Sequence, residues 1–265
     1  MNKVVVITGA SSGIGRSLCF ELAKHYQHLF ICGRSEQKLK ELASELISEK
    51  VKVEVVPLDL LSDLSVEKAA YQIISNCRQV DLLVNNAGLS QRSLAADTDG
   101  EVEKMLFQIN YFAPVLLTKL LIGRLRNSNN GKIVITSSIA GKFGYYLRST
   151  YSATKHALHG FFESLRMEEK ANGISVLFMT IGRAQTNISV NAMTQNGKKY
   201  GKMDQGQEGG LSPEKVAAQM MNAIRNNKRE TLIGGKEIYM VYFKKLFPWL
   251  FYRIANKKIK TEGGV

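Results

Sequence analysis

A glycine-rich turn close to the N-terminus constrains the fold of this chain more than any other feature. Residues 4–7 are a short, uninterrupted run of branched apolar residues, which is typical of a strand buried on both faces of a sheet. The turn occupies residues 8–15, and a helical pattern runs from about residue 14 to residue 24. A strand, a glycine-rich turn and a helix in this order predict the first unit of a parallel sheet.

Strands and helices are expected to alternate along the rest of the chain. Further strands are expected at residues 29–32, 51–58, 81–85, 132–137, 174–180 and 230–234. Helical patterns lie between them at residues 35–50, 65–77, 100–126, 151–171 and 213–227. We therefore predict a single α/β domain over residues 1–265, a Rossmann-type doubly wound parallel sheet with helices on both faces. Right-handed crossovers bring the carboxyl ends of all strands to one edge, where ligands bind.

The composition is typical of a globular protein and narrows the range of partners. Apolar residues make up 45% of the chain, and the formal net charge is +13. Such a charge suits nucleic acid, an anionic membrane surface or a phosphorylated ligand. Because the basic residues are scattered until the C-terminal stretch, no nucleic acid partner is expected. The N-terminal pattern predicts no signal peptide, and no run reaches the ~18 uninterrupted apolar residues of a spanning helix.

Cysteine and histidine show no spacing typical of a disulfide framework or a metal site. Cys19, Cys32 and Cys77 form no CxxC pair, so we expect no metal, a reducing compartment and a cytoplasmic location. His156 and His159 share one helical face. We expect both at the surface or in an interface.

The glycine-rich turn is also the expected dinucleotide-binding loop. Glycine lets the backbone turn sharply and approach a pyrophosphate, which the N–H groups and the dipole at the start of the helix favour. The alternative is a purely structural turn, and the position between a strand and a helix argues against it. The candidate binding residues are Gly9, Ser11, Ser12, Gly13, Ile14 and Gly15.

The end of the second strand distinguishes the two nicotinamide cofactors. An acidic residue there binds the ribose 2′-hydroxyl of NAD, whereas a basic residue accepts the extra phosphate of NADP. This chain has Arg34 and no acid at that point. The planar, permanently charged guanidinium suits a phosphate, so NADP(H) is favoured over NAD(H). An ordinary solvated charge is the alternative.

Two further strand ends are expected to complete the binding edge. Asp59 and Leu60 follow the third strand and are candidates for bordering the adenine. Asn86, Ala87 and Gly88 follow the fourth strand, where the chain has to pass close to a ribose.

Tyr151, Lys155 and Ser138 are the candidate catalytic residues. Tyr151 and Lys155 are four residues apart in a helical pattern, so their side chains share one face. That spacing alone arises about once by chance in a chain with this composition. Ser138, however, follows the buried strand that precedes this helix, which places its hydroxyl at the same sheet edge.

These residue types suit proton transfer during the reduction of a carbonyl or the oxidation of an alcohol. Hydride transfer to a carbonyl leaves an alkoxide that needs a proton, and tyrosine has an ordinary pKa of about 10. Lys155, a positive nicotinamide ring and the helix N-terminus all favour tyrosinate, so we expect a lowered pKa for Tyr151. Ser138 is expected to hydrogen-bond the substrate oxygen.

Together these motifs resemble the short-chain dehydrogenase/reductase family over roughly residues 3–190. The resemblance is carried by residues 8–15, residues 85–88, Ser138 and the run Tyr151-Ser152-Ala153-Thr154-Lys155. It implies an oxidoreductase in which Tyr151 is the acid and base, Lys155 lowers the pKa of that tyrosine and binds the ribose, and Ser138 positions the substrate. It also implies that Asn110, in the long middle helix, supports a proton relay through a water.

The chain departs from the family pattern after the sixth strand. The family usually has Pro-Gly-x-x-x-Thr there, and this chain has Ile181 in place of the proline. Ala184 and Thr186 are still expected to contact the cofactor. Without the proline we expect a less rigid loop.

Two segments near the C-terminus are expected to shape the substrate end. Residues 187–212 are rich in Asn, Gln, Gly and Lys and lie where the family has a mobile substrate lid; an ordinary surface loop is the alternative. Residues 237–265 mix aromatic and basic residues, which suits contact with a membrane surface, a cap over the substrate pocket or a subunit contact.

The leading functional hypothesis is an NADP(H)-dependent enzyme that interconverts a ketone and a secondary alcohol on a hydrophobic or lipid-like small molecule. One alternative is an NADP(H)-binding sensor or scaffold without turnover. Another is a peripheral membrane protein that acts through its C-terminal segment. The family resemblance implies a homodimer or homotetramer assembled through the helices at residues 100–126 and 151–171.

Overall fold

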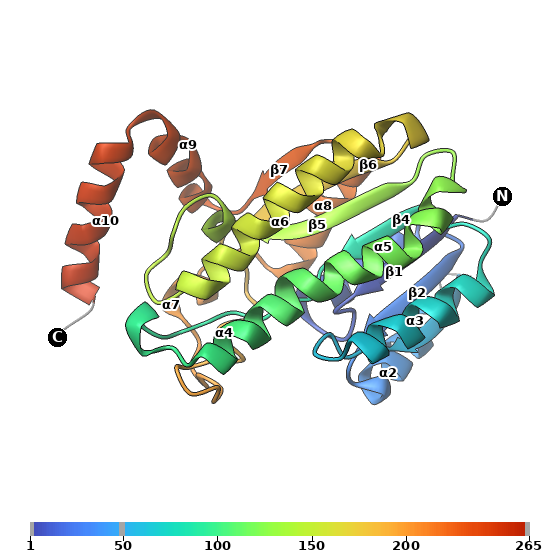
Figure 1. The fold of residues 1–265 in the computed structure, drawn as a ribbon, viewed down its shortest axis with the longest axis horizontal. Coiled ribbons are helices and arrows are strands. Elements are labelled where there is room, and N and C mark those ends of the chain that lie inside the picture. Colours follow the sequence, from blue (N-terminus) through green and yellow to red (C-terminus); the bar gives the residue numbers. More distant parts are fainter. Residues whose placement is uncertain (1–2, 48–50, 263–265) are drawn as a thin grey trace.

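Seven parallel strands form the centre of the protein, which confirms the predicted doubly wound α/β class. The structure is a computed structural model that describes residues 3–47 and 51–262. Within these residues the strand order is β3-β2-β1-β4-β5-β6-β7, so the chain winds outward in both directions from β1 (Figure 1). The strands are β1 (Val4–Thr8), β2 (His28–Gly33), β3 (Lys52–Pro57), β4 (Leu82–Asn85), β5 (Lys132–Ser138), β6 (Ser175–Ile181) and β7 (Glu230–Ile233).

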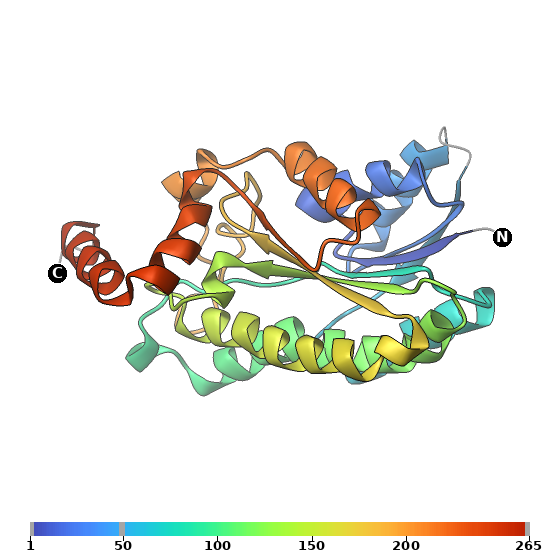
Figure 2. The ribbon, with the colours of Figure 1, turned by 90° about the horizontal axis from the view of Figure 1, so that it is seen from above.

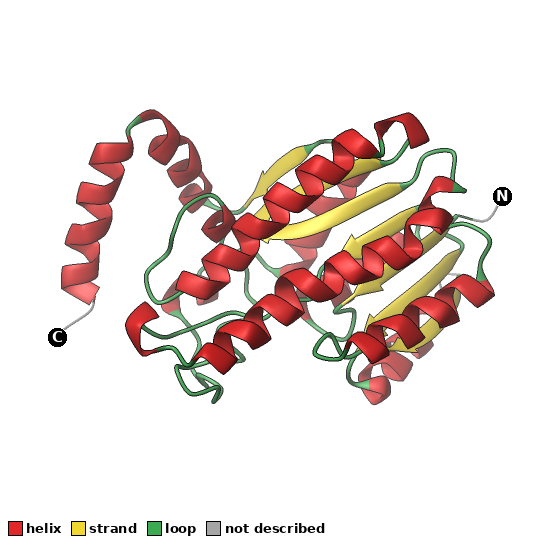
Figure 3. Cartoon of the chain, in the orientation of Figure 1, coloured by secondary structure: helices red, strands yellow, loops and turns green. Residues whose placement is uncertain are grey.

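Helices cover both faces of this sheet, as Figures 2 and 3 show. One face carries α1 (Gly13–Ala23), α2 (Glu36–Leu46) and α8 (Pro213–Arg225). The other face carries α3 (Asp63–Asn76), α5 (Ala113–Arg126) and α6 (Ser149–Glu168). The remaining elements are α4 (Gly100–Phe107), α7 (Gln205–Glu208), α9 (Tyr239–Leu246), α10 (Pro248–Glu262), η2 (Ala95–Asp97), η3 (Gln108–Phe112), η4 (Ile139–Gly141), η5 (Lys170–Asn172) and η6 (Lys236–Ile238).

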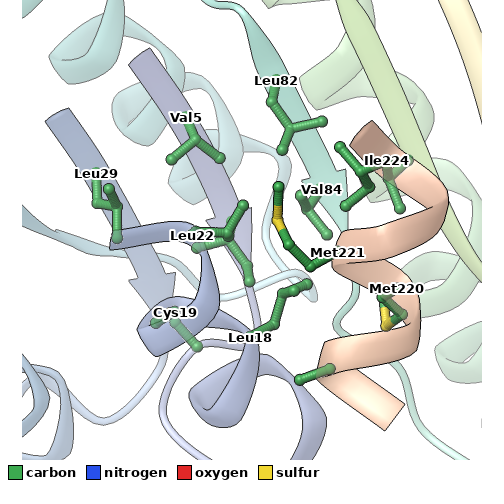
Figure 4. Packing of buried hydrophobic residues seen from close by; sticks show 14 of the residues in the cluster. Val5, Leu18, Cys19, Leu22, Leu29, Leu82, Val84, Met220, Met221 and Ile224 are labelled. Atoms are coloured by element: carbon green, nitrogen blue, oxygen red, sulfur yellow. The ribbon is translucent and has the colours of Figure 1, made fainter. Parts of the chain in front are cut away.

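Alternate side chains of each strand enter two separate hydrophobic cores. Val5 packs with Leu22 of α1 and Met221 of α8, as Figure 4 shows. Its neighbour Val6 points to the opposite face and packs in the second core. Because both faces of β1 are buried, the strand is uniformly apolar instead of alternating with polar residues.

The predicted helix boundaries differ from the observed ones at identifiable points. The helix expected over residues 100–126 contains a π-turn, η3, between α4 and α5. The helix expected over residues 151–171 is α6, and the chain then turns through η5 to Gly173, whose φ is +74°. The predicted end of the second helix, at residues 48–50, lies outside the described residues. α9 and α10 are helices in a segment for which the pattern predicts no defined secondary structure.

One segment, Gly100–Arg126, is long and apolar enough by composition to cross a membrane. In the structure 44% of its most apolar window is buried. Its α5 part packs on the sheet in the second core, beside α3. This burial is typical of the covering helix of a globular domain.

Candidate functional site

A cleft of about 2030 Å³ runs along the carboxyl edge of the sheet. The ends of β1, β2, β5 and β6 line it, together with parts of residues 187–212 and of α9 and α10. Its volume exceeds the roughly 300–1,000 Å³ of a pocket for one drug-sized ligand. The cleft therefore has room for a dinucleotide and a second molecule.

The structure brings all but one of the candidate residues together on this cleft. The exception is Asn110, which lies buried behind the cleft wall. The candidate residues that line the cleft are Gly9, Ser11, Ser12, Gly13, Ile14, Gly15, Arg34, Asp59, Leu60, Asn86, Ala87, Gly88, Ser138, Tyr151, Lys155, Ala184 and Thr186.

The glycine-rich turn requires glycine for two physical reasons. Gly9 and Gly13 have φ values of +68° and +53°, which strain residues with a side chain. A Cβ on Gly15 would lie 2.1 Å from the carbonyl oxygen of Gly9, and one on Gly9 would lie 2.9 Å from the Cα of Ala87. The turn therefore packs tightly against the chain after β4 while its backbone stays accessible from the cleft.

The N-terminus of α1 has no internal cap. Ser12 stands at the N-cap position without a capping hydrogen bond, and the first turn has no acidic residue. Ser35, Ser62 and Ser212, by contrast, cap α2, α3 and α8 with their hydroxyls. The free N–H groups and the positive dipole end at α1 fit a phosphate-bearing ligand.

Thr8 and Asn86 fasten the loop after β4 to the glycine-rich turn. The Thr8 hydroxyl accepts hydrogen bonds from the backbone N–H groups of Asn86 (3.0 Å) and Ala87 (3.1 Å). The Asn86 amide donates to the Thr8 carbonyl at 3.1 Å. Asn86 therefore holds the loop after β4 in place and also lines the cleft.

Two cations border the cleft where the chain leaves β2. Arg34 and Lys38 both line it, one helical turn apart, with Ser35 as the N-cap of α2 between them. Both side chains are exposed, and neither has a hydrogen-bonding partner among the residues described. The sequence interpretation identified Arg34 but missed Lys38, although the spacing of four residues could have revealed it.

Tyr151 and Lys155 lie on successive turns of α6, opposite the end of β5. The Lys155 Nζ lies 5.8 Å from the centre of the Tyr151 ring and donates to the Thr136 carbonyl at 2.9 Å. The Ser138 hydroxyl is hydrogen-bonded to Tyr151. A Cβ on Gly141 would lie 3.1 Å from the Lys155 Cβ, so the turn after Ser138 packs directly on α6.

The pKa of Tyr151 is raised, not lowered, by its surroundings in the protein. Burial removes water from the phenolate and is the dominant cause. The hydrogen bond from Ser138 and the positive charges of Arg148 and Arg92 act in the opposite direction. Our expectation of a lowered pKa is therefore wrong for the protein's own groups, because desolvation outweighs the nearby charges.

Burial also lowers the pKa of Lys155 to about 8. Lys155 as a whole is only 5% exposed, so its ammonium group loses hydration. This loss favours the neutral amine. Lys155 can therefore gain or lose a proton close to neutral pH.

Asn110 joins three elements at the back of the site. Its Oδ1 accepts the backbone N–H of Leu89 at 2.8 Å, and its Nδ2 donates to the Leu89 carbonyl at 2.9 Å. The same Nδ2 donates to the Thr154 hydroxyl on α6 at 3.1 Å. The π-turn η3 carries Asn110, and such turns are frequent at functional sites.

Gln91, which the sequence interpretation missed, caps α6 from outside the helix. Its Oε1 accepts the backbone N–H groups of Thr150 (2.9 Å) and Tyr151 (3.1 Å). The N-cap residue of α6, Arg148, makes no capping hydrogen bond of its own. A buried amide from the loop after β4 thus positions the start of the helix that carries Tyr151.

His159 is buried within the domain, which corrects the expectation that it lies at the surface or in an interface; His156 is exposed, in line with that expectation. The His159 Nε2 lies 3.0 Å from the Ser137 hydroxyl, and its ring stacks on Phe178 with centroids 4.3 Å apart. Burial, aided by the charge of Lys142, lowers the pKa of His159 to about 4. α6 directs the His159 side chain toward the sheet. The helical periodicity alone did not distinguish a buried histidine from an exposed one.

Hydrogen bonds hold the loop after β6, and its lower rigidity without the proline stays a prediction. The Glu237 Oε1 accepts the backbone N–H groups of Arg183 (2.8 Å) and Gly235 (3.0 Å). The Gly182 N–H donates to the Ile233 carbonyl at 2.7 Å. Glu237, which the sequence interpretation missed, thus orders the loop in which the family proline is absent.

Residues 187–212 are fastened to the rest of the site by charge. Asp204 of this segment accepts hydrogen bonds from Arg92 and from Arg148, the latter at 2.8 Å. Arg92 is 7% exposed, and its backbone N–H donates to the Met193 carbonyl at 2.8 Å. Parts of the segment line the cleft in the structure, and its motion as a lid stays a prediction.

The site favours acid–base chemistry supported by an organic cofactor. No cluster of three or more His, Cys, Asp and Glu side chains suited to a metal ion occurs in residues 3–47 and 51–262, and the three cysteines are free. A buried phenol, a lysine able to titrate near neutral pH and a serine hydroxyl line the same cleft as an uncapped helix N-terminus.

Comparisons with known proteins agree with this geometry. The model of the short chain dehydrogenase family matches residues 3–197. The Dehydrogenase/reductase SDR family member 7B of Xenopus laevis is 38% identical over 271 residues, which cover 98% of this chain and 84% of that protein.

Solved structures share the fold. A short chain dehydrogenase/reductase from Burkholderia phymatum, in complex with NAD, has a TM-score of 0.82 at 21% identity and covers 94% of this chain and 95% of its own. L-Sorbose reductase from Gluconobacter frateurii, complexed with NADPH and L-sorbose, has a TM-score of 0.77 at 24% identity and covers 88% and 95%. Sequence, fold and site agree, and the chain belongs to the short-chain dehydrogenase/reductase family of nicotinamide-dependent oxidoreductases.

Proposed function

We propose that this protein is an NADP(H)-dependent oxidoreductase that interconverts a ketone and a secondary alcohol on a hydrophobic, lipid-like substrate. One observation carries the proposal: Tyr151 and Lys155 line the same cleft as the uncapped start of α1. A bound nicotinamide cofactor supplies or accepts the hydride. The protein's own residues bind, orient and exchange the proton.

Each residue of the site has a distinct role in this proposal. Tyr151 exchanges a proton with the substrate oxygen, and Ser138 orients that oxygen by a hydrogen bond. Lys155 has a pKa of about 8 and passes the proton onward. Asn110 is a positioning residue, because its amide holds Leu89 and α6 in place; its support of a water relay is part of the proposal.

The preference for NADP(H) rests on the pair of cations after β2. Arg34 and Lys38 stand together at the cleft without protein partners among the described residues, which is favourable for a phosphate. The backbone of residues 9–15, with Asp59, Leu60, Ala87, Gly88, Ala184 and Thr186, would hold the remainder of the dinucleotide.

The walls of the substrate end support a hydrophobic substrate. Asp204 pairs with Arg92 and Arg148, the two arginines whose charges act on Tyr151, so neither guanidinium is left without a partner there. The apolar and aromatic residues that line this end are Phe143, Tyr145, Leu147, Met193, Tyr200, Met203, Met240 and Phe251.

The test is a turnover panel with the purified full chain. Ketones of increasing apolar size, and the matching secondary alcohols, are offered with NADPH or NADH and with the oxidised forms, and the absorbance of the reduced cofactor is followed. We expect turnover with NADPH that improves with apolar size. NADPH binding without turnover of any compound would favour the sensor alternative, and preference for small polar ketones would contradict a hydrophobic substrate.

Arg34→Asp tests the cofactor preference separately. An aspartate would repel the 2′-phosphate and accept a ribose hydroxyl, so we expect the KM for NADPH to rise about tenfold or more and the KM for NADH to fall. Lys68→Asp, at an exposed position of α3 outside the cleft lining, makes the same charge change and is the matched control. Unchanged values for both cofactors would make Arg34 an ordinary surface charge.

Assembly as a homodimer or homotetramer, in the cytoplasm, completes the proposal. Phe112 and Leu120 on the α4–α5 segment, and Met167 on α6, are exposed large apolar residues on the helices expected to pair. Sedimentation velocity of the full chain measures the assembly directly, and a monomer at all concentrations would contradict it.

A further inference from the structure

α9 and α10 carry a concentration of exposed apolar side chains that the proposed reaction does not use. Seventeen large hydrophobic residues are exposed in the described chain, and seven of them lie within residues 239–254. These seven are Tyr239, Tyr242, Leu246, Phe247, Trp249, Tyr252 and Ile254. Soluble proteins usually scatter such residues singly, so this gathering indicates a contact surface, here called the α9–α10 surface.

The inner side of the two helices is anchored to the domain. Phe251 is 3% exposed, and its ring lies 5.0 Å from that of Phe143, centroid to centroid. Figures 1 and 2 show both helices at one end of the molecule, with α10 standing off from the sheet and its covering helices. One side of the two helices therefore packs on the domain, and the other side is exposed.

The charge of this segment is strongly positive, because α9 and α10 contain six basic residues and one acidic residue, Glu262 at the end of α10. Between residues 238 and 261 the chain has six basic residues and no acidic one: Lys244, Lys245, Arg253, Lys257, Lys258 and Lys260. Lys245 and Arg253 are exposed beside the apolar side chains. The side chains of the last three lie outside the described residues.

We propose that the α9–α10 surface docks on an anionic lipid bilayer, with both helices lying in the bilayer interface. Aromatic side chains favour the headgroup boundary, and basic ones are attracted to anionic lipid. α9 has 8 residues and α10 has 15, and the backbone breaks between them at Phe247, so neither helix can span a bilayer core.

Two other occupants fit the surface less well. In a symmetric contact, a second copy of the chain would bring the same positive charges together. Single-stranded nucleic acid would use the aromatic rings for stacking, but Leu246 and Ile254 have no ring to stack. An apolar layer with anionic headgroups matches both the aliphatic and the charged residues.

The surface adjoins the cleft. Met240 of α9, and Phe251, Ile254 and Ala255 of α10, line the cleft as well as belonging to these helices. A lipophilic substrate would therefore reach the cleft directly from the bilayer. This consequence rests on the proposed function, whereas docking itself does not.

Trp249 provides a direct probe, because it is the only tryptophan in the chain and is 67% exposed. The full chain is mixed with phosphatidylcholine vesicles, with or without phosphatidylglycerol. With anionic vesicles we expect the tryptophan emission to shift to shorter wavelength and brominated acyl chains to quench it. High salt should weaken the effect. No shift and no quenching would overturn the proposal.

Paired variants separate docking from general attraction of a basic protein. Lys245→Glu with Arg253→Glu should lower vesicle affinity about tenfold or more. Lys68→Glu with Lys228→Glu makes the same charge change elsewhere and should alter it less than about twofold. Equal losses would overturn the proposal.

A second pair tests the apolar contribution by vesicle co-sedimentation. Leu246→Ser with Tyr252→Ser should abolish most binding, whereas Leu64→Ser with Tyr71→Ser, on exposed positions of α3, should not. Tighter binding to single-stranded polynucleotide than to anionic vesicles, or self-association that needs Trp249 without lipid, would also overturn the proposal. None of these readouts uses the cofactor or a substrate, so their failure is distinct from failure of the proposed reaction.

Discussion

At the scale of single residues, the site depends on side chains that hold other groups in place. Gln91 is fully buried, and its amide makes hydrogen bonds on both of its sides. Its Oε1 caps two N–H groups at the start of α6, while its Nε2 donates to the hydroxyls of Ser93 and Thr98. Because one of the capped groups is the backbone of Tyr151, the amide fixes where the phenol stands.

We expect Gln91→Leu to lower both stability and turnover. Leucine fills similar space but leaves two buried N–H groups unpaired, at a cost of about 1–3 kcal/mol each in the free energy of unfolding. Gln91→Glu keeps an acceptor at a helix N-terminus and should retain most of the stability. Chemical denaturation and kcat measure both effects, and a Gln91→Leu variant as stable and active as the parent would contradict the capping role.

At the scale of elements, the loop after β6 is ordered by a partner from the C-terminal segment. The Glu237 carboxylate receives two N–H groups, and a Cβ on Gly182 would lie 2.3 Å from its Oε1, so the loop is packed around this group. Farther along the same loop, the Thr186 methyl lies 3.3 Å from where a Cβ on Gly13 would be. Glu237 thus influences how one wall of the cleft meets the glycine-rich turn.

Glu237→Ala should weaken cofactor binding with a smaller effect on kcat. Loss of hydrogen bonds to a charged acceptor costs about 1.5–3 kcal/mol, which corresponds to roughly a tenfold or greater increase in the KM for NADPH. Glu237→Gln retains an acceptor oxygen and should restore most of the affinity. The prediction is wrong if the alanine variant binds NADPH as tightly as the parent in a fluorescence titration.

At the scale of the whole molecule, the sequence analysis predicted the features that depend on short-range patterns. It missed the contacts between residues that are far apart in the sequence. The glycine-rich turn, the Tyr151–Lys155 spacing and the strand alternation are short-range patterns, and the structure contains each of them. Gln91 acts on a helix 59 positions away, and Glu237 on a loop 54 positions away. Nothing in a single sequence pairs such residues, because only the fold brings them into contact.

The stability of the whole fold should fall in mild acid, and His159 should account for part of the loss. Its pKa is about 4 in the folded protein against an ordinary value of 6.5. Between those two values the unfolded chain binds a proton that the folded state excludes, so the free energy of unfolding falls as the pH falls from 6.5 toward 4. The contribution is on the order of 1–3 kcal/mol.

Denaturant unfolding at several pH values measures this slope. His159→Gln should flatten it, whereas His25→Gln, at an exposed position just after α1, should change it less. An identical slope in both variants would show that other groups determine the acid sensitivity.

The central claim is that Tyr151 exchanges the proton within a cleft that binds NADP(H) independently of the phenol. Tyr151→Phe removes only the hydroxyl, so the most direct measurement is an NADPH titration and a turnover assay on this variant. We predict an NADPH Kd within about threefold of the parent value and a kcat lower by at least about 10²-fold. Retention of the parent kcat would contradict the claim.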